Sequence, residues 1–177
     1  MKLQILILSL LFINQSYGQC EADFIYFNEI PESLNILSGD SCFYNQDINV
    51  IYELILLNNL EYNSPLEVGT QLWYEGRLRS WIAGYYFGGV NAQLDTLPNN
   101  FGDINDLRSL YLEWNNINTM PQSMSNLTNL QSLYISNNNL INIAENIGDL
   151  SQLYFLDLGY NQITTIPDSF VELTNLQ

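Results

Sequence analysis

Carboxylates are the only plentiful side chains in this 177-residue chain that could carry out acid–base chemistry. The sequence holds 19 Asp and Glu, no His and only four Lys and Arg, which gives a formal net charge of −15 at pH 7. The commonest general bases and Schiff-base residues are therefore scarce, and zinc sites built on His and Cys clusters are excluded. No pair of carboxylates stands out by its spacing. We expect no enzyme, no cofactor and no metal, and keep a carboxylate-dependent hydrolase as the last alternative.

Aromatic side chains offer a different kind of chemistry, which is binding without reaction. Exposed Tyr and Trp are typical hot spots of protein interfaces, and aromatic rings also stack on sugars. Five aromatic residues share one stretch of the chain with two carboxylates, in the order Tyr111, Glu113, Trp114, Tyr134, Phe155, Asp157 and Tyr160. Whether these side chains meet on one surface depends on the elements that carry them.

A pattern with a period of 23 residues runs through the same stretch, as the spacing of Leu107, Leu130, Leu153 and Leu176 shows. The frame around the first three is Leu107-x-x-Leu110-x-Leu112-x-x-Asn115-x-Ile117, Leu130-x-x-Leu133-x-Ile135-x-x-Asn138-x-Leu140 and Leu153-x-x-Leu156-x-Leu158-x-x-Asn161-x-Ile163. The frames alternate along the chain with segments in which apolar residues stand three positions apart. Three of these segments begin with a proline, at Pro98, Pro121 and Pro167. Such segments predict a short helix or 3-10 turn.

The frame resembles that of the leucine-rich repeat family, L-x-x-L-x-L-x-x-N-x-L. The resemblance implies an α/β fold: a leucine-rich repeat solenoid with a curved parallel sheet of four or five strands and short helices or 3-10 turns on the convex side. In each strand, alternation sends the leucines inward and the residues between them outward, onto the concave face. The inward leucines of one coil are buried only by stacking on the next coil.

The resemblance also assigns roles to residues within each coil. It implies that an inward ladder of asparagines binds backbone groups at the bend after each strand, formed by Asn115, Asn138 and Asn161. The chemistry fits, because an amide both donates and accepts hydrogen bonds. The outward columns read Ser109/Ser132/Phe155, Tyr111/Tyr134/Asp157 and Glu113/Ser136/Gly159, flanked by Trp114/Asn137/Tyr160. We therefore expect the ligand-binding residues on this concave face: Tyr111, Glu113, Trp114, Tyr134, Phe155, Asp157 and Tyr160. An aromatic-rich but merely solvated sheet is the alternative, since tyrosine favours strands.

The N-terminus has the features of a secretory signal peptide over residues 1–18. Lys2 supplies a positive start, Leu3–Ile13 is an apolar run, and small residues stand at Ser16 and Gly18, the −3 and −1 positions of a cleavage site. The run is shorter than the roughly 20 residues that span a bilayer. We expect a secreted or cell-surface protein. A lipid anchor at Cys20 is the alternative, but Gln19 precedes it where a small residue is needed.

Residues 19–75 do not follow the repeat, and we expect them to form an N-terminal cap over the open end of the first coil. Cys20 and Cys42 are the only cysteines, and in an oxidising compartment we expect a disulfide between them, with two free thiols as the alternative. One amphipathic helix is predicted from Asp47, as its N-cap, to Leu60. A disulfide-bonded cap with one such helix resembles that of secreted bacterial leucine-rich repeat proteins.

The junction between cap and repeats is rich in aromatic residues. We expect Trp73 and Trp81 to pack between the cap and the first coil, and a binding face is the alternative. The first coil is also longer than the later ones, since 17 residues separate Trp81 from Pro98. Tyr85–Ala92 is the expected insertion, either a ligand contact or a loop that covers the cap.

These observations divide the chain into a signal peptide (1–18), a cap with one helix (19–75) and leucine-rich repeats (76–177). We expect the repeats to be truncated at the C-terminus, because Gln177 falls where the next strand should begin. The acidic surface predicts neither nucleic-acid partners nor membrane insertion within these residues. The expected function is a secreted or cell-surface recognition module that binds a protein or glycan through its concave face. The alternative is a ligand-sensing ectodomain fragment of a longer membrane receptor.

Overall fold

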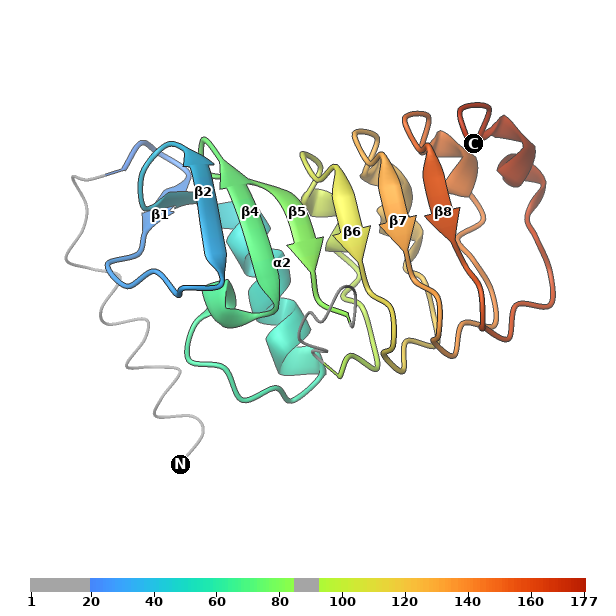
Figure 1. Cartoon of the computed structure of the whole chain (residues 1–177), viewed down its shortest axis with the longest axis horizontal. Helices are drawn as coiled ribbons and strands as arrows, with labels where there is room; N and C mark the ends of the chain where they lie inside the picture. Colours follow the sequence, from blue (N-terminus) through green and yellow to red (C-terminus); the bar gives the residue numbers. More distant parts are fainter. Residues whose placement is uncertain (1–19, 85–92) are drawn as a thin grey trace.

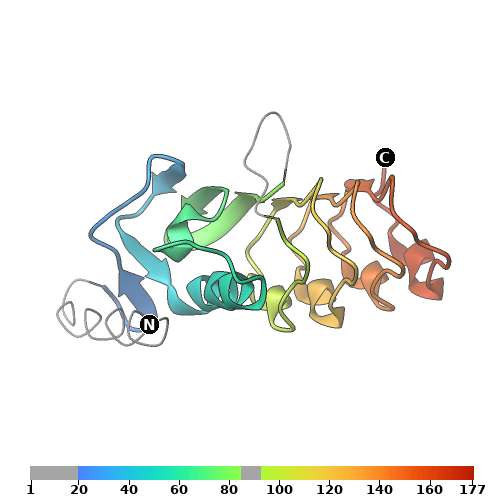
Figure 2. The same cartoon turned by 90° about the horizontal axis from the view of Figure 1, so that it is seen from below.

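The structure is a computed structural model that describes residues 20–84 and 93–177. The expected signal peptide and the expected insertion at Tyr85–Ala92 lie outside the described residues. Figure 1 shows an elongated molecule whose strands lie side by side from the N-terminal cap towards the C-terminus. Seen at 90° in Figure 2, the strands of the repeats lie along one side and the helix and short turns along the other.

Four parallel strands of the described chain form the sheet of the repeats: β5 (Arg77–Ile82), β6 (Ser109–Tyr111), β7 (Ser132–Tyr134) and β8 (Phe155–Asp157). The register advances by one repeat per strand, because Leu110 pairs with Leu133 and Leu133 pairs with Leu156. The other side of each coil carries a 3-10 turn: η3 (Phe101–Asp103), η4 (Gln122–Asn126), η5 (Ile147–Asp149) and η6 (Asp168–Glu172). This arrangement confirms the predicted α/β solenoid.

The sheet extends further into the cap than the sequence indicated. β4 (Thr70–Tyr74) pairs antiparallel with β5, and β2 (Leu34–Ser38) pairs parallel with β4, so the described sheet has six strands rather than four or five and is not wholly parallel. The turn between β4 and β5 places Gly76 at a φ of 69°. A Cβ atom there would lie 2.5 Å from the carbonyl oxygen of Cys42, so only glycine fits.

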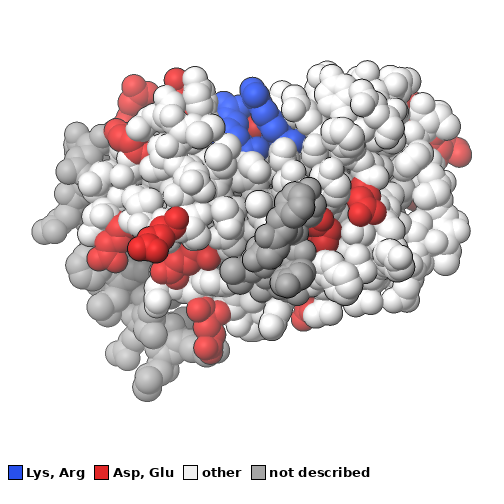
Figure 3. All heavy atoms as spheres, in the orientation of Figure 1, with Lys and Arg blue, Asp and Glu red and all other residues white. Residues whose placement is uncertain are grey.

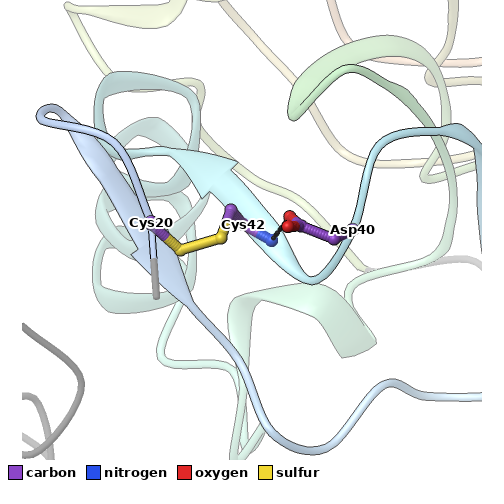
Figure 4. Close-up of a disulfide and its surroundings, with 3 residues drawn as sticks. All are labelled: Cys20, Asp40 and Cys42. Carbon is purple, nitrogen blue, oxygen red and sulfur yellow. Dashed lines mark hydrogen bonds between the residues drawn. A yellow bond between two sulfur atoms is a disulfide. The ribbon is translucent and has the colours of Figure 1, made fainter. Parts of the chain in front are cut away.

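The remaining cap elements are β1 (Phe24–Tyr26), its antiparallel partner β3 (Cys42–Tyr44), α2 (Asn45–Leu57) and η2 (Pro65–Glu67). Figure 4 shows the disulfide that joins Cys20 to Cys42, which confirms the predicted pairing. A hydrogen bond of 2.9 Å from the Cys42 N–H to Asp40 Oδ1 fixes the chain beside it. The bridge therefore ties the start of the described chain to the strand that leads into α2.

A single apolar core runs through the cap and the repeats. The inward leucines Leu110 and Leu133 are fully buried. Trp73 and Trp81 are fully buried as well, which confirms that they pack rather than form a binding face. The ring of Trp73 lies 4.8 Å from that of Phe43 in the cap, and the Trp81 ring stacks at 6.0 Å on Phe101 of the first coil. The two indoles thus join the cap core to the solenoid core.

The prediction that Asp47 caps the helix is wrong. The N-cap of α2 is Tyr44, whose side chain makes no capping hydrogen bond, and Asp47 lies fully buried in the first turn. The Asp47 carboxylate accepts hydrogen bonds from Arg77 Nε at 3.0 Å, from Arg77 Nη2 at 3.1 Å and from the Leu78 N–H at 2.9 Å. Burial of a carboxylate is tolerated when ionic and backbone donors satisfy it in this way.

The same network reaches the repeats. Arg77 Nη1 lies 2.8 Å from Asp106 Oδ2, and Arg79 Nη1 lies 3.3 Å from Asp106 Oδ1. The Arg77 guanidinium also stacks 4.4 Å above the Tyr44 ring. Helix α2, strand β5 and the segment before β6 are therefore held together by one chain of charged groups.

Removal of the central carboxylate should loosen this junction. We expect Asp47→Ala to lower the free energy of unfolding by about 3 kcal/mol, because it leaves the Leu78 N–H without an acceptor and Arg77 without its buried partner. The exposed acid Glu53, on the same helix, supplies the control: Glu53→Ala should change the free energy by less than about 0.5 kcal/mol. Urea unfolding measures both, and equal effects would show that the ion pair does not stabilise the junction.

Candidate ligand-binding face

The outward side chains of β6, β7 and β8, together with the residues directly after each strand, form what we call the sheet face. Strand register aligns Ser109 with Ser132, Tyr111 with Tyr134 and Tyr134 with Asp157. The alignment continues beyond the strands, where the Trp114 N–H donates to the Ser136 carbonyl and the Asn137 N–H to that of Gly159. The columns predicted from the sequence are therefore the columns of the structure.

An asparagine in each coil holds the bend that follows the strand. Asn115 Oδ1 accepts a hydrogen bond from the Leu94 N–H at 2.8 Å, and its Nδ2 donates to the carbonyl of Ala83 at 2.9 Å. Asn138 repeats this arrangement between neighbouring coils, with bonds of 2.9 Å from the Ile117 N–H and to the Leu112 carbonyl. Asn161 does the same in the next coil, as Oδ1 accepts from the Leu140 N–H at 3.0 Å. All three amides act inside the solenoid and are not available to a ligand.

The residue before each ladder asparagine adopts left-handed backbone geometry. The φ angles are 60° at Trp114, 55° at Asn137 and 53° at Tyr160. Asn tolerates this region, whereas bulky residues occupy it at a cost. Trp114 nevertheless is 56% exposed and Tyr160 is 86% exposed, so neither ring is buried in the core. Burial in the core therefore does not account for aromatic residues at these two positions.

Other predicted residues line the same face. Tyr111 and Tyr134 stack with ring centroids 4.9 Å apart and planes inclined by 6°. Phe155, on the next strand, is 48% exposed. The structure thus gathers the five predicted aromatic residues on or beside one surface.

Glu113 departs from the expectation of an open carboxylate. It lies in its predicted column, but its side chain is only 5% exposed. The Oε2 atom is buried and, among the described residues, receives no hydrogen bond. Burial raises the pKa of Glu113, a hydrogen bond from its own N–H opposes that shift, and the negative charge of Asp157 adds to it. Asp157 is more accessible, and its Oδ1 accepts a hydrogen bond of 2.9 Å from the Gly159 N–H.

Charges are distributed unevenly around the sheet face. Figure 3 shows Asp and Glu atoms over the strands of the repeats, whereas Lys and Arg atoms gather at one edge, near the N-terminal ends of β5 and β6. The described cations are Arg77, Arg79 and Arg108. Two of them are neutralised by Asp47 and Asp106. The strand ends that carry Glu113 and Asp157 therefore have no cation of their own among the described residues.

Within the described ranges, no group of three or more His, Cys, Asp or Glu is arranged to hold a metal ion. The described helices include none that is long and apolar enough to cross a membrane.

Sequence reasoning missed two features of this face. The left-handed geometry at Trp114, Asn137 and Tyr160 had a local clue, because Asn137 is a residue type that favours it. The enclosure of Glu113 had none, because its neighbours come from other coils. Gly84, for example, lies so near that a Cβ atom on it would clash with the backbone of Glu113.

Comparison with known protein families finds a match over three segments of the chain. The family described as Leucine Rich Repeat matches residues 106–127, 129–150 and 152–173. No curated protein sequence matches the chain significantly.

Two solved structures with TM-scores of 0.50 and 0.59 show the same kind of fold. A leucine-rich repeat protein of Leptospira interrogans is 25% identical, with a TM-score of 0.50 over 61% of this chain and 28% of that one. The ectodomain of the Arabidopsis thaliana receptor kinase SOBIR1 is 18% identical, with a TM-score of 0.59 over 76% of this chain and 77% of that one. The ectodomain of the A. thaliana receptor kinase GASSHO1/SCHENGEN3, solved with CASPARIAN STRIP INTEGRITY FACTOR 2, is 30% identical with a TM-score of 0.45, over 64% of this chain and 12% of that one. The chain thus spans under a third of two of these proteins.

The strained aromatic positions give a stability test. We expect Tyr160→Asn to raise the free energy of unfolding by about 1 kcal/mol, because Asn relieves the left-handed strain and the exposed ring contributes little to the core. The reverse change in the preceding coil, Asn137→Tyr, should lower it by a similar amount. Urea unfolding of both variants checks the pair. Destabilisation by Tyr160→Asn would mean that the ring supports the fold, and its exposure would no longer indicate a binding role.

Proposed function

Since residues 106–173 of this chain are leucine-rich repeats, we propose that the protein is a non-enzymatic recognition module that binds a protein or glycan through the sheet face. The contact residues are Tyr111, Glu113, Trp114, Tyr134, Phe155, Asp157 and Tyr160. We place the protein outside the cytoplasm, as a secreted or cell-surface molecule, because its cap carries a disulfide and such bonds persist in oxidising compartments.

The observation that carries this proposal is the pair of exposed rings on strained backbone. Trp114 and Tyr160 occupy left-handed positions where Asn137 shows that a small polar residue suffices. Backbone strain kept at positions whose side chains remain largely exposed is a feature of functional sites. Exposed Trp and Tyr beside a rigid sheet are also the residue types that dominate binding energy in interfaces.

A second candidate is the ligand-sensing ectodomain fragment of a longer membrane receptor. The likeness to the SOBIR1 ectodomain concerns the fold, and its description as a receptor kinase ectodomain supports keeping this candidate. Both candidates use the sheet face for binding, so they share the test that follows.

Selection from a random peptide library and screening on a glycan array would supply ligands for the test. We expect the double variant Trp114→Asn/Tyr160→Asn to bind the selected ligands at least about tenfold more weakly than the unmodified protein. Both substitutions suit the local backbone, so the variant should fold.

The matched control removes exposed apolar side chains away from the sheet face. Leu56 on α2 and Val171 in η6 are both exposed, and Leu56→Asn/Val171→Asn should leave affinity within about twofold. Isothermal titration calorimetry compares the variants. Equal affinity of the aromatic double variant and the unmodified protein would place the binding site elsewhere.

A further inference from the structure

In one column of the sheet face, the side chains become smaller from each coil to the next. The column begins with Glu113, continues with Ser136 and ends at Gly159. Among the described residues, apart from Gly159 and its chain neighbours, the atoms within 4 Å of the position that a Cβ atom would take on Gly159 are Asp157 Oδ1 at 3.1 Å and Ser136 Cβ at 3.9 Å. Space for a ligand group therefore opens over Gly159, at the end of the column opposite Glu113.

The carboxylate of Glu113, at the start of this column, lacks a hydrogen bond from the described residues at one of its oxygens. Glu113 is enclosed, and its Oε2 atom receives no hydrogen bond from a described residue. A buried carboxylate oxygen without a donor is costly, and native structures keep few of them. A positive charge placed over the column would offset that cost through its attraction to the buried carboxylate.

A second carboxylate borders the same space. Asp157 ends β8, two strands from β6, and strand spacing places the two backbones roughly 10 Å apart. Two negative charges at this separation repel one another. The pKa of Glu113 is raised mainly by burial, and the charge of Asp157 adds to that shift. A positive charge between them would interact favourably with both.

The flanking residues suit a cation as well. Trp114 and Tyr160 stand in the adjacent column with exposed rings, and aromatic faces attract ammonium and guanidinium groups. The described cations lie at the opposite ends of the strands, and the whole chain carries a formal charge of −15. A basic partner would therefore be attracted over long range and meet no repulsion at this end of the sheet face.

We propose that the sheet face receives a Lys or Arg side chain of a partner protein, whose charged group lies over Ser136 and Gly159 between the carboxylates of Glu113 and Asp157. This assignment rests on the proposed function and narrows its ligand from a protein or glycan to a basic protein segment. A neutral sugar could donate hydrogen bonds to the carboxylates, but it would not relieve their mutual repulsion. A charged donor does both.

Hexalysine is a suitable probe for this site. We expect Glu113→Gln/Asp157→Asn, which keeps the shape of both side chains, to weaken hexalysine binding at least about tenfold at low ionic strength. The control Glu145→Gln/Asp168→Asn removes the same charge from two exposed acids outside the sheet face, and it should change affinity less than about twofold. If both double variants lost hexalysine affinity equally, the effect would come from overall charge alone, and the proposal would be overturned.

A third variant tests the space rather than the charge. Gly159 has no positive φ, so a side chain there is compatible with the backbone, although the Asp157 carboxylate must shift slightly because the new Cβ atom would lie 3.1 Å from its Oδ1 atom. The side chain of Gly159→Gln should fill the place of the bound group. We expect it to weaken hexalysine binding about as much as the loss of both carboxylates. Calorimetry measures all affinities, and circular dichroism checks that each variant folds.

Failure of this inference can be told apart from failure of the proposed function. Should the unmodified protein not bind hexalysine, or should the variants at Glu113, Asp157 and Gly159 bind it unchanged, the basic-segment assignment is wrong. The proposed function would still stand if ligands from the library or array lose affinity in the Trp114→Asn/Tyr160→Asn variant. Retained affinity in that variant would overturn the proposed function itself.

Discussion

Burial of the repeat leucines is the constraint on which the structure depends. A coil of this size cannot cover its own inward side chains, so Leu110 and Leu133 are buried only because neighbouring coils stack on them. Stacking in turn needs a tight bend after every strand, and tight bends leave backbone groups without partners. The ladder of Asn115, Asn138 and Asn161 supplies those partners across the coil boundary. Core and ladder together fix the backbone, and the outward residues are left without a part in the core.

The cap meets the same constraint at the N-terminal end. It continues the sheet through β4 and β2, and it closes the core with Trp73 and Trp81. The buried pair of Asp47 and Arg77 fixes the angle at which α2 meets the first coil, because the carboxylate is held by donors from β5 at both the side chain and the backbone. A rigid junction of this kind lets the first coil present its strand in register with the rest.

Periodicity explains which features could be predicted from the sequence. The strands β6 to β8, the 3-10 turns and the outward columns all follow from the 23-residue repeat, because identical spacing forces identical placement. Short strands or turns were expected over residues 20–44, where β2 lies, but strand β4 and the pairing of β2 with the main sheet were missed because these segments lie outside the repeat. Asp47 was misassigned because its partner Arg77 is 30 residues away in the sequence. The local sequence around a buried, ion-paired Asp does not differ from that around an Asp that caps a helix. Glu113 was expected to be exposed, because the alternation of residues along a strand shows only which way a side chain points. How far that side chain is exposed depends on the neighbouring coils.

Side-chain footprinting with hydroxyl radicals would determine whether the sheet face is the binding surface. The exposed rings of Trp114, Phe155 and Tyr160 and the exposed side chains of Leu56 and Val171 would be oxidised in the free protein. At saturating concentrations of a selected ligand, we expect slower oxidation of the three aromatic residues and unchanged oxidation of Leu56 and Val171. Protection of Leu56 or Val171 with no change at the three rings would contradict it.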